Sequence, residues 1–242
     1  MKAVVTGAAS GVGLALVREL NARGAQVIGA DLAGDERAKR VSEAGGAFFA
    51  CDVTSAADWK RLAAAARERF GTLDFAALNA GIMTRPPSAP IDDDALGWAG
   101  GDRYRRLFAV NVDGVVLGLA ALVPVMAQGS AIVATSSAAG LMALPWDPYY
   151  AATKHAVVGL VRSFGPPLAA RGIRINALCP AGIDTAIVPI VARATTPASE
   201  LRPPEYAAKA ALAVAASPES GATFVFSDDA AFVRRYDVPS PL

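Results

Sequence analysis

Three side chains that can move protons stand close together in one part of the chain. Tyr150 and Lys154 are four residues apart in a run, residues 149–170, that has the pattern of a helix. They therefore share one helix face, with Cβ atoms roughly 5–6 Å apart. A nearby ammonium favours the charged form of a phenol, whose ordinary pKa is about 10. We expect Lys154 to lower the pKa of Tyr150, so that Tyr150 acts as a general acid or base near neutral pH.

A hydroxyl group precedes this pair. Ser137 lies thirteen residues before Tyr150 and follows the apolar, strand-like residues 131–135. Its side chain would emerge at the carboxyl end of a strand, where ligands bind in open α/β sheets. A Tyr-x-x-x-Lys pair alone is more often an ordinary pair on a helix surface than a catalytic device. Its position relative to the other motifs favours catalysis.

A glycine-rich turn follows the first strand-like segment. The sequence Thr6-Gly-Ala-Ala-Ser-Gly-Val-Gly13 opens the first helix-like run. Its glycines allow a tight turn and let the backbone approach a pyrophosphate, whose charge the helix N-terminus favours. The turn residues that we expect to contact a dinucleotide are Gly7, Ser10, Gly11, Val12 and Gly13.

A carboxylate selects between two forms of that dinucleotide. Asp31 ends the second strand-like run, eighteen residues after Gly13. At this position it accepts hydrogen bonds from ribose hydroxyls and repels a 2′-phosphate. Ser10 and Leu32 offer no positive charge to such a phosphate. The sequence therefore predicts NAD rather than NADP, and the alternative is a surface or helix-capping aspartate.

Composition limits the classes of partner. The 242 residues include 23 basic and 22 acidic side chains, for a net charge of +1. The absence of a charged block favours a small-molecule partner over nucleic acid or an anionic membrane. Two cysteines and one histidine are too few for a disulfide framework or a structural metal site. We expect no metal site.

The hydropathy of the chain and its N-terminal residues indicate where in the cell the protein is located. The mean hydropathy of +0.35 is high, yet the longest apolar run, residues 112–127, is shorter than the roughly 20 residues that span a bilayer. No signal-like segment precedes the first strand-like run. We expect a cytoplasmic protein in which a buried sheet and apolar helix faces account for the hydropathy.

One junction pattern recurs four times. A helix-like run closes on a glycine and a strand-like run follows directly, at Gly24, Gly45, Gly71 and Gly172. Such links produce right-handed β-α-β crossovers. We expect an α/β, Rossmann-type fold with a doubly wound parallel sheet of about seven strands flanked by helices on both faces, in a single domain spanning residues 1–242. Strands are expected at 3–6, 26–30, 47–51, 73–78, 130–135, 173–178 and 222–226, and helices at 12–22, 35–44, 56–70, 103–127, 149–171 and 204–216.

Two stretches interrupt this rhythm. Residues 82–101 contain three prolines, a pair of glycines and three aspartates, which indicate an irregular loop over the carboxyl edge. Residues 183–204 mix apolar residues with prolines and threonines, and we expect a substrate lid loop there. An ordinary surface loop is the alternative for each.

Together these features resemble the short-chain dehydrogenase/reductase family in its common short form. The resemblance extends from Lys2 to about Phe226. The residues from Thr6 to Gly13 match the family's T-G-x-x-x-G-x-G turn. Its other motifs are matched by Asp52 and Val53, by Asn79, Ala80 and Gly81, by Asn111, and by Ser137, Tyr150 and Lys154.

The resemblance implies a role for each matched residue. Tyr150 would exchange the alcohol proton, and Ser137 would bind the substrate oxygen. Lys154 would hold the nicotinamide ribose and lower the pKa of Tyr150. Asn111 would position a water that links Lys154 to solvent. The cofactor would supply the hydride chemistry, on a secondary alcohol or ketone that is mostly apolar.

The segment after the sixth strand-like run also resembles the family's. This segment implies cofactor contacts by Ile183 with the nicotinamide carboxamide and by Thr185 near the phosphates. The separate match of Asp52 and Val53 implies a contact with adenine. Pro180 and Gly182 belong to the same contact segment. Ala181 stands where glycine is usual, and residues 227–242 depart from the family pattern, so contacts of that tail are not carried over.

Several residues have plainer interpretations. Tyr149 and His155 point away from the Tyr150–Lys154 face and are expected to be structural. Four residues in carboxyl-edge loops are expected either to line a substrate site or to pack in the core, namely Met83, Trp98, Met142 and Trp146.

Three functions are compatible with these motifs. The first is an NAD-dependent dehydrogenase or reductase of secondary alcohols and ketones. The second is a non-catalytic NAD-binding regulatory module. The third is a sugar-nucleotide epimerase or dehydratase, although the chain leaves little room for a separate substrate domain after the last strand. We expect a homotetramer or homodimer in which the helices at 103–127 and 149–171 pair.

Overall fold

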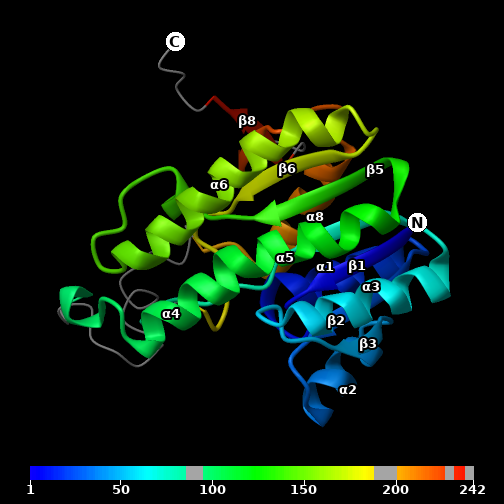
Figure 1. Cartoon of the computed structure of the whole chain (residues 1–242), viewed down its shortest axis with the longest axis horizontal. Helices are drawn as coiled ribbons and strands as arrows, with labels where there is room; N and C mark the ends of the chain where they lie inside the picture. The colour runs from blue at the N-terminus through cyan, green and yellow to red at the C-terminus, as the bar shows by residue number, and fades with distance from the viewer. Residues whose placement is uncertain (86–94, 188–200, 227–231, 238–242) are drawn as a thin grey trace.

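An eight-stranded sheet forms the centre of the molecule (Figure 1). The computed structural model describes residues 1–85, 95–187, 201–226 and 232–237. The strand order is β3-β2-β1-β4-β5-β6-β7-β8, and every pair from β3 to β7 is parallel. The strands are β1 Lys2–Thr6, β2 Gln26–Asp31, β3 Ala47–Ala50, β4 Leu73–Leu78, β5 Met126–Thr135, β6 Arg174–Cys179, β7 Thr223–Phe226 and β8 Val233–Tyr236.

Helices cover both faces of the sheet. Side chains of α3, α5 and α6 pack on one face, and those of α1, α2 and α8 pack on the other. The helices are α1 Gly11–Ala22, α2 Asp35–Glu43, α3 Ala56–Phe70, α4 Asp102–Phe108, α5 Gly114–Leu122, α6 Pro148–Ala169 and α8 Pro204–Ala216. This arrangement confirms the Rossmann-type α/β class expected from the repeated helix–glycine–strand junctions.

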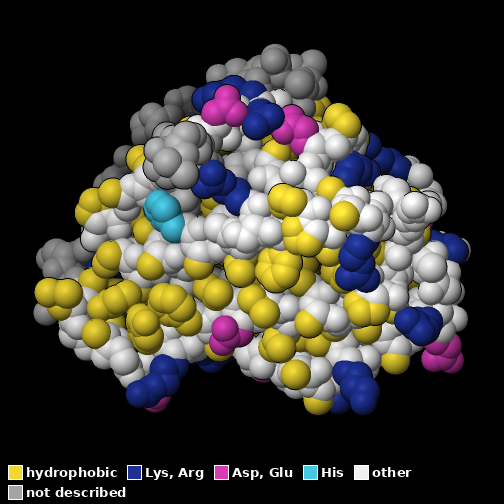
Figure 2. All heavy atoms as spheres, turned by 45° about the horizontal axis from the view of Figure 1, so that its top comes forward, with side chains coloured by type: hydrophobic (Ala, Val, Ile, Leu, Met, Phe, Trp, Pro, Cys, Tyr) yellow, Lys and Arg dark blue, Asp and Glu magenta, His cyan; other side chains and the backbone are white. Residues whose placement is uncertain are grey.

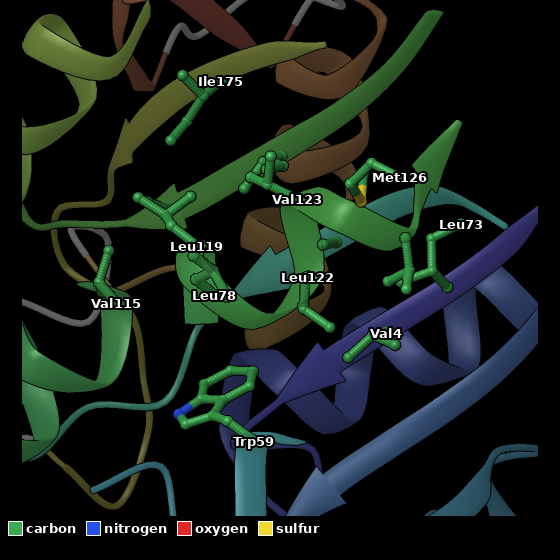
Figure 3. Close-up of a cluster of buried hydrophobic side chains, with 14 of the residues drawn as sticks. Val4, Trp59, Leu73, Leu78, Val115, Leu119, Leu122, Val123, Met126 and Ile175 are labelled. Carbon is green, nitrogen blue, oxygen red and sulfur yellow. The ribbon is translucent and has the colours of Figure 1, made fainter. Parts of the chain in front are cut away.

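Two apolar cores hold the helices to the sheet. In the core of Figure 3, Trp59 of α3 and Leu119 of α5 lie over Val4 and Leu78 of the central strands. The indole Nε1 of Trp59 donates to the carbonyl oxygen of Val53 at 2.9 Å, so this large ring is buried without an unpaired donor. Each such side chain contributes roughly 1.5–3 kcal/mol on burial. The strand ends that carry the functional residues are therefore held rigidly.

The strand order reverses between β1 and β4. From β1 the chain winds outward to β2 and β3, and it then returns to β4 on the other side of β1. The loops after β1 and β4 therefore diverge and leave a crevice at the carboxyl edge. The glycine-rich turn, Asn79 and Ser137 all follow strands that end at this edge.

The helix expected at 103–127 is not continuous. The helix α4 passes into a π-helical turn, Ala109–Asp113, before α5, and a short 3-10 helix, Val123–Val125, leads into β5. Pro124 lies in that last turn and cannot donate to a continuing helix. Strand β5 consequently begins at Met126, four residues before the expected start. The π turn places Asn111 at the site described below.

The expectation of about seven strands is corrected by β8. This strand pairs antiparallel with β7, from Thr223↔Tyr236 to Phe226↔Val233. Its sequence, Val-Arg-Arg-Tyr, is short and half charged, so it lacks the apolar run that indicates a buried strand. Arginines are compatible with this position because β8 is an edge strand and one side of it faces solvent.

Parts of both expected loops lie outside the described residues. Residues 86–94 of the first loop and 188–200 of the lid loop are not described, and the lid expectation therefore stays a prediction. The described ends of the second loop meet, since Ile183 and Arg202 form an isolated parallel bridge. In the first loop, a 3-10 helix spans Ala95–Trp98.

One described segment passes a simple test for membrane spans. Residues Asp102–Val125 are long and apolar enough by length and composition alone. The buried share of the most apolar window is 44%, and α5 within it packs on the sheet. Core helices of soluble proteins are often equally long and apolar, so this segment alone does not indicate a membrane span.

Candidate active site

The ends of three neighbouring strands are joined by Thr6 and Asn79. The hydroxyl of Thr6 accepts hydrogen bonds from the backbone nitrogens of Asn79 and Ala80 at 3.0 and 3.1 Å. The amide nitrogen of Asn79 donates to the carbonyl oxygen of Thr6 at 3.1 Å, and the hydroxyl of Thr135 donates to its amide oxygen at 3.2 Å. Asn79 thus fixes the carboxyl ends of β1, β4 and β5 relative to one another.

The glycine-rich turn has no room for larger side chains. A Cβ atom on Gly13 would lie 2.0 Å from the carbonyl oxygen of Gly7. Gly7 and Gly11 have φ angles of 65° and 49°, in the left-handed region that favours glycine. The N-cap residue Ser10 makes no side-chain cap bond to α1, and Ser10, Gly11 and Val12 line the cavity described below. The N-terminus of α1 therefore suits a pyrophosphate.

Asp31 is bound to this turn. Its Oδ2 accepts from the backbone nitrogen of Ala9 at 2.9 Å, and its Oδ1 accepts from that of Leu32 at 2.8 Å. The carboxylate is therefore oriented by two amides and lies beside the glycine-rich turn. The residues present fit an adenine dinucleotide, with a narrow turn for the pyrophosphate and a carboxylate for the ribose.

Ser137, Tyr150 and Lys154 come together at the carboxyl end of β5. Ser137 precedes a short 3-10 helix, Ala138–Gly140, and its hydroxyl accepts from the backbone nitrogen of Ala139 at 3.2 Å. The same hydroxyl is near enough to the phenol of Tyr150 to lower its pKa. The Nζ of Lys154 lies 5.6 Å from the centre of the Tyr150 ring. The structure thus brings the three predicted residues into one cluster.

The expected lowering of the Tyr150 pKa is wrong for the protein alone. Burial of the phenol, which disfavours its anion, is the largest effect and raises the pKa of Tyr150 to about 12. The hydrogen bond with Ser137 lowers the pKa, whereas the carboxylate of Asp147 raises it. Sequence spacing indicated the nearby ammonium but not the depth of burial. In the protein alone Tyr150 is therefore a proton donor at neutral pH.

Lys154 is buried with its ammonium directed at the sheet. Its Nζ donates to the carbonyl oxygen of Thr135 at 2.9 Å, and only 3% of the residue is exposed. Burial lowers the pKa of Lys154 to about 8. The hydroxyl of Ser136 donates to the carbonyl oxygen of Lys154 at 2.8 Å, and a Cβ on Gly140 would lie 2.7 Å from the same oxygen. Gly140 thus permits the close approach of α6 to β5.

The side-chain amide of Asn111 is fully engaged by protein groups. Its oxygen accepts from the backbone nitrogen of Ile82 at 2.9 Å. Its nitrogen donates to the carbonyl oxygen of Ile82 at 2.9 Å and to the hydroxyl of Thr153 at 3.0 Å. The hydroxyl of Thr153 donates to the carbonyl oxygen of Tyr150 at 2.7 Å. Asn111 therefore ties the π turn to the loop after β4 and to α6.

A buried carboxylate fixes the start of α6. Asp147 is 0% exposed, and its Oδ1 accepts from the backbone nitrogen of Tyr150 at 3.1 Å as the N-cap. Its Oδ2 accepts from the backbone nitrogens of Thr84 and Arg85 at 3.1 and 3.3 Å. One side chain thus aligns Tyr150 and the loop after Gly81.

A cavity of about 550 Å³ connects the turn to the cluster. Part of its lining is apolar, and we call this part the apolar wall: Met83, Met142, Leu144, Trp146 and Ile187. The predicted site residues that line it are Gly7, Ser10, Gly11, Val12, Asn79, Ala80, Gly81, Ser137, Tyr150, Lys154, Pro180, Gly182, Ile183 and Thr185. The predicted residues that do not line it are Gly13, Asp31, Leu32, Asp52, Val53 and Asn111.

The structure shows the surroundings of Tyr149 and His155, for which we expected structural roles. Tyr149 packs edge to face on Tyr104 with ring centres 5.2 Å apart. The Nδ1 of His155 lies 2.9 Å from the carbonyl oxygen of Ala151, on the exposed side of α6. Sequence reasoning missed Thr6, Thr135, Asp147 and Thr153 because each of these side chains bonds a residue that is distant in the sequence.

A parallel sheet with a glycine-rich turn at its switch point, and a Ser–Tyr–Lys cluster beside it, defines a dinucleotide-dependent oxidoreductase. A family model described as short chain dehydrogenase matches residues 1–194. The chain belongs to the short-chain dehydrogenase family. As a member it is an oxidoreductase that transfers hydride between a nicotinamide cofactor and an alcohol or ketone.

Curated relatives and solved structures agree with this assignment. The chain is 38% identical over 245 residues to cis-4-hydroxycyclohexanecarboxylate dehydrogenase of Sinomonas cyclohexanicum, covering 96% of this chain and 91% of that protein. It is 38% identical over 209 residues to 2,5-dichloro-2,5-cyclohexadiene-1,4-diol dehydrogenase of Sphingobium indicum, covering 83% and 78%. A 3-ketoacyl-(acyl-carrier-protein) reductase from Brucella melitensis, complexed with NADH, superposes with a TM-score of 0.80 at 28% identity, covering 93% of this chain and 95% of that one.

Proposed function

We propose that this protein is an NAD-dependent dehydrogenase of apolar, ring-containing secondary alcohols, and a reductase of the matching ketones. One observation carries the proposal. Ser137 and Tyr150 line the same cavity as the apolar wall, and the Ser137 hydroxyl is near enough to the phenol to lower its pKa. A substrate oxygen can be bound at these hydroxyls while a hydrocarbon ring packs on the wall.

The protein's own groups account for the proton and for orientation. In ketone reduction, Tyr150 donates its proton to the substrate oxygen while Ser137 donates a hydrogen bond to the same oxygen. In alcohol oxidation, Tyr150 accepts the proton, which requires its pKa to fall from about 12. Lys154 contributes positive charge toward that fall. When bound, the nicotinamide exchanges the hydride with the substrate carbon.

Asp31 supports NAD rather than NADP. Its carboxylate is held by the amides of Ala9 and Leu32, and a 2′-phosphate placed there would meet a negative charge. The other cofactor contacts that we propose are those of the glycine-rich turn, of Asn79, Ala80 and Gly81, and of Pro180, Gly182, Ile183 and Thr185. Asp52 and Val53 are proposed to contact adenine.

Two observations support the substrate class, namely the apolar wall of the cavity and the substrates for which similar proteins are named. The described residues of the wall are thioether, indole and aliphatic side chains, namely Met83, Met142, Leu144, Trp146 and Ile187. Two relatives are named for substituted six-membered rings, and another for borneol. Lys154 is the charged side chain among the described cavity residues, and it bonds Thr135. We therefore propose ring-containing secondary alcohols as preferred substrates.

The experiment is oxidation of a panel of cyclic secondary alcohols with NAD, followed by nicotinamide absorbance. The panel includes cyclohexanol, borneol and 4-hydroxycyclohexanecarboxylate. Tyr150→Phe is expected to lower kcat by a factor of about 10²–10⁴, while the matched control Tyr149→Phe keeps its activity. Equal activity of Tyr150→Phe and the parent would refute the assigned acid–base role.

We further propose a cytoplasmic homodimer or homotetramer formed by a single-domain chain. Apolar side chains gather on the face that carries α4, α5 and α6 (Figure 2). Val116 of α5 is 39% exposed and Phe164 of α6 is 38% exposed. Sedimentation should show an oligomer at micromolar concentration, and Val116→Arg should shift it toward monomer. A monomeric parent protein would contradict the assembly.

A further inference from the structure

A parallel bridge joins the two described ends of the loop after β6. The backbone nitrogen of Asp184 donates to the carbonyl oxygen of Arg202 at 2.9 Å, and the backbone nitrogen of Arg202 donates to the carbonyl oxygen of Gly182 at 2.6 Å. Ile183 lies between these two bonds and lines the cavity, as does Leu201 on the other segment. The position of Arg202 therefore fixes the place of Ile183, which we propose to contact the nicotinamide.

Arg202 leads directly into α8 and packs on a ring in its first turn. Pro203 and Pro204 follow Arg202, and their fixed φ angles leave this link few conformations. The guanidinium carbon of Arg202 lies over the Tyr206 ring, 4.4 Å from its centre, where the ring face attracts a cation. The segment that bonds Ile183 is thus attached to Tyr206 both along the chain and through this side-chain contact.

Two further rings hold Tyr206, and both come from the last strands of the sheet. The Tyr206 ring centre lies 5.0 Å from that of Phe226, at the end of β7, with an interplanar angle of 79°. It lies 5.2 Å from that of Phe232, directly before β8, with an angle of 66°. Tilted and edge-to-face pairs of this kind are favoured over flat stacks. We call Tyr206, Phe226 and Phe232 the aromatic cluster.

The backbone conformation of Phe232 is unfavourable for its side chain. Its φ angle is 63°, and no other non-glycine residue in the described part of the chain has a positive φ. Such a conformation is rare for a bulky residue and persists only where surrounding contacts hold it. The contacts here are the Tyr206 ring and the Nζ of Lys209, which lies 5.9 Å from the Phe232 ring centre. Pairing of β8 with β7 begins at the next residue, with Phe226↔Val233. Strand β8 therefore holds the Phe232 ring against α8.

We propose that Tyr206 and Phe232 are positioning residues for the nicotinamide half of the cofactor. The inference rests on the proposed NAD site. Neither residue is among the described residues that line the cavity, so both act through others. The aromatic cluster holds Arg202, Arg202 holds Ile183, and Ile183 limits where the nicotinamide ring lies. Strand β8 is thus a remote part of the cofactor site as well as the edge of the sheet.

Calorimetric titration with NADH and with ADP-ribose tests the inference without a substrate. ADP-ribose lacks the nicotinamide, so its affinity should not depend on Ile183. Tyr206→Leu removes one ring of the cluster, and Phe232→Gly removes another while accepting the positive φ. Tyr206→Phe is the conservative variant. The matched control Tyr236→Leu removes a ring from the opposite end of β8, where Tyr236 pairs with Thr223.

The expected result is a loss confined to the nicotinamide half. With Tyr206→Leu or Phe232→Gly, the affinity for NADH should fall roughly three- to tenfold, whereas the affinity for ADP-ribose should change less than about twofold. Tyr206→Phe should keep the parental affinities, because it retains the ring that Arg202 and Phe232 contact. Ile183→Ala should also weaken NADH alone, and adding Tyr206→Leu to it should cost little more, since both changes affect one contact. Tyr236→Leu should leave both affinities unchanged.

Other outcomes separate the inference from the proposal beneath it. If Tyr206→Leu and Phe232→Gly weaken NADH and ADP-ribose by the same factor, or weaken neither, the positioning role is overturned while the NAD site stands. Full additivity of Tyr206→Leu and Ile183→Ala would overturn it too, as would an equal effect of Tyr236→Leu. If the parent binds neither NADH nor ADP-ribose, the proposed cofactor site fails and the inference falls with it. Thermal unfolding shows which variants are folded, and Phe232→Gly decides the question if Tyr206→Leu is not.

Discussion

The amide nitrogen of Asn111 donates a hydrogen bond to the hydroxyl of Thr153 at 3.0 Å. The hydroxyl of Thr153 in turn donates a hydrogen bond to the carbonyl oxygen of Tyr150 at 2.7 Å. Through Thr153, the π turn Ala109–Asp113 is thus connected to the backbone of Tyr150, which we assign as the proton donor. We infer that the position of the Tyr150 ring depends on this pair of polar side chains.

Removal of the Thr153 hydroxyl tests that dependence. In Thr153→Val, one N–H of Asn111 and the carbonyl oxygen of Tyr150 lose a buried partner, which should lower the free energy of unfolding by roughly 1–3 kcal/mol. We expect kcat to fall more than KM changes, because the displaced group is the proton donor. Thr153→Ser keeps the hydroxyl and should restore both quantities. A purely packing role would instead be signalled if serine behaves like valine.

Burial of Lys154 predicts a stability change with pH. Its pKa is lowered to about 8 from the ordinary 10.5, so between these values the unfolded chain binds more protons than the folded one. Stability therefore rises with pH in this window. From pH 7 to pH 9 the gain should be about 1 kcal/mol for this group.

The measurement is urea unfolding at pH 7, 8 and 9 for the parent and Lys154→Met. The thiols of Cys51 and Cys179 have raised pKa values, of about 12 and 11, against an ordinary value of 9.0. Because unfolded thiols ionise around pH 9, the two cysteines lower stability from about pH 8 upward. Parent and variant share this contribution, so the difference between their pH profiles isolates Lys154. A parent and variant with parallel pH profiles would contradict a buried, charged Lys154.

We predict opposite effects on stability for alanine substitutions at Gly13 and at Gly159. A Cβ at Gly13 would meet the carbonyl oxygen of Gly7 at 2.0 Å, so Gly13→Ala should destabilise the fold by more than roughly 1–3 kcal/mol and abolish nucleotide binding. Gly159, inside α6, has no atom within 4 Å of such a Cβ. Gly159→Ala should stabilise by about 0.5–1 kcal/mol. Thermal unfolding and NADH titration of both variants check the pair, and equal effects would refute the crowding argument.

We predict that removal of the Asp147 carboxylate lowers the free energy of unfolding by more than the loss of an ordinary helix N-cap does. In Asp147→Ala, α6 loses its N-cap, worth about 1 kcal/mol, and two further backbone nitrogens in the loop after β4 lose their acceptor. We expect a total of roughly 2–4 kcal/mol by urea unfolding. Ser55→Ala, which removes the N-cap of α3, is the control and should cost about 1 kcal/mol. Equal losses would show that the loop contacts contribute little.

The sequence determined the class of fold and the chemical groups of the site. Local patterns were sufficient for this, because a glycine-rich turn after a strand, an aspartate at the end of the next strand and a Tyr-x-x-x-Lys pair each lie within a short stretch of chain. The helix–glycine–strand junctions likewise predicted the crossovers that make the sheet parallel. The short charged strand β8 was missed because its pairing with β7, rather than its own composition, makes it a strand.

Only the tertiary structure decided how those groups behave. The four-residue spacing placed Lys154 near Tyr150, but burial, which depends on the whole packed molecule, moves the pKa of Tyr150 up and that of Lys154 down. The break in the helix at Asn111 follows from bonds to Ile82 and Thr153, 29 and 42 residues away in the chain. Desolvation and long-range hydrogen bonds are properties of residues brought together by folding, so a local reading of the chain contains the groups but not their energies.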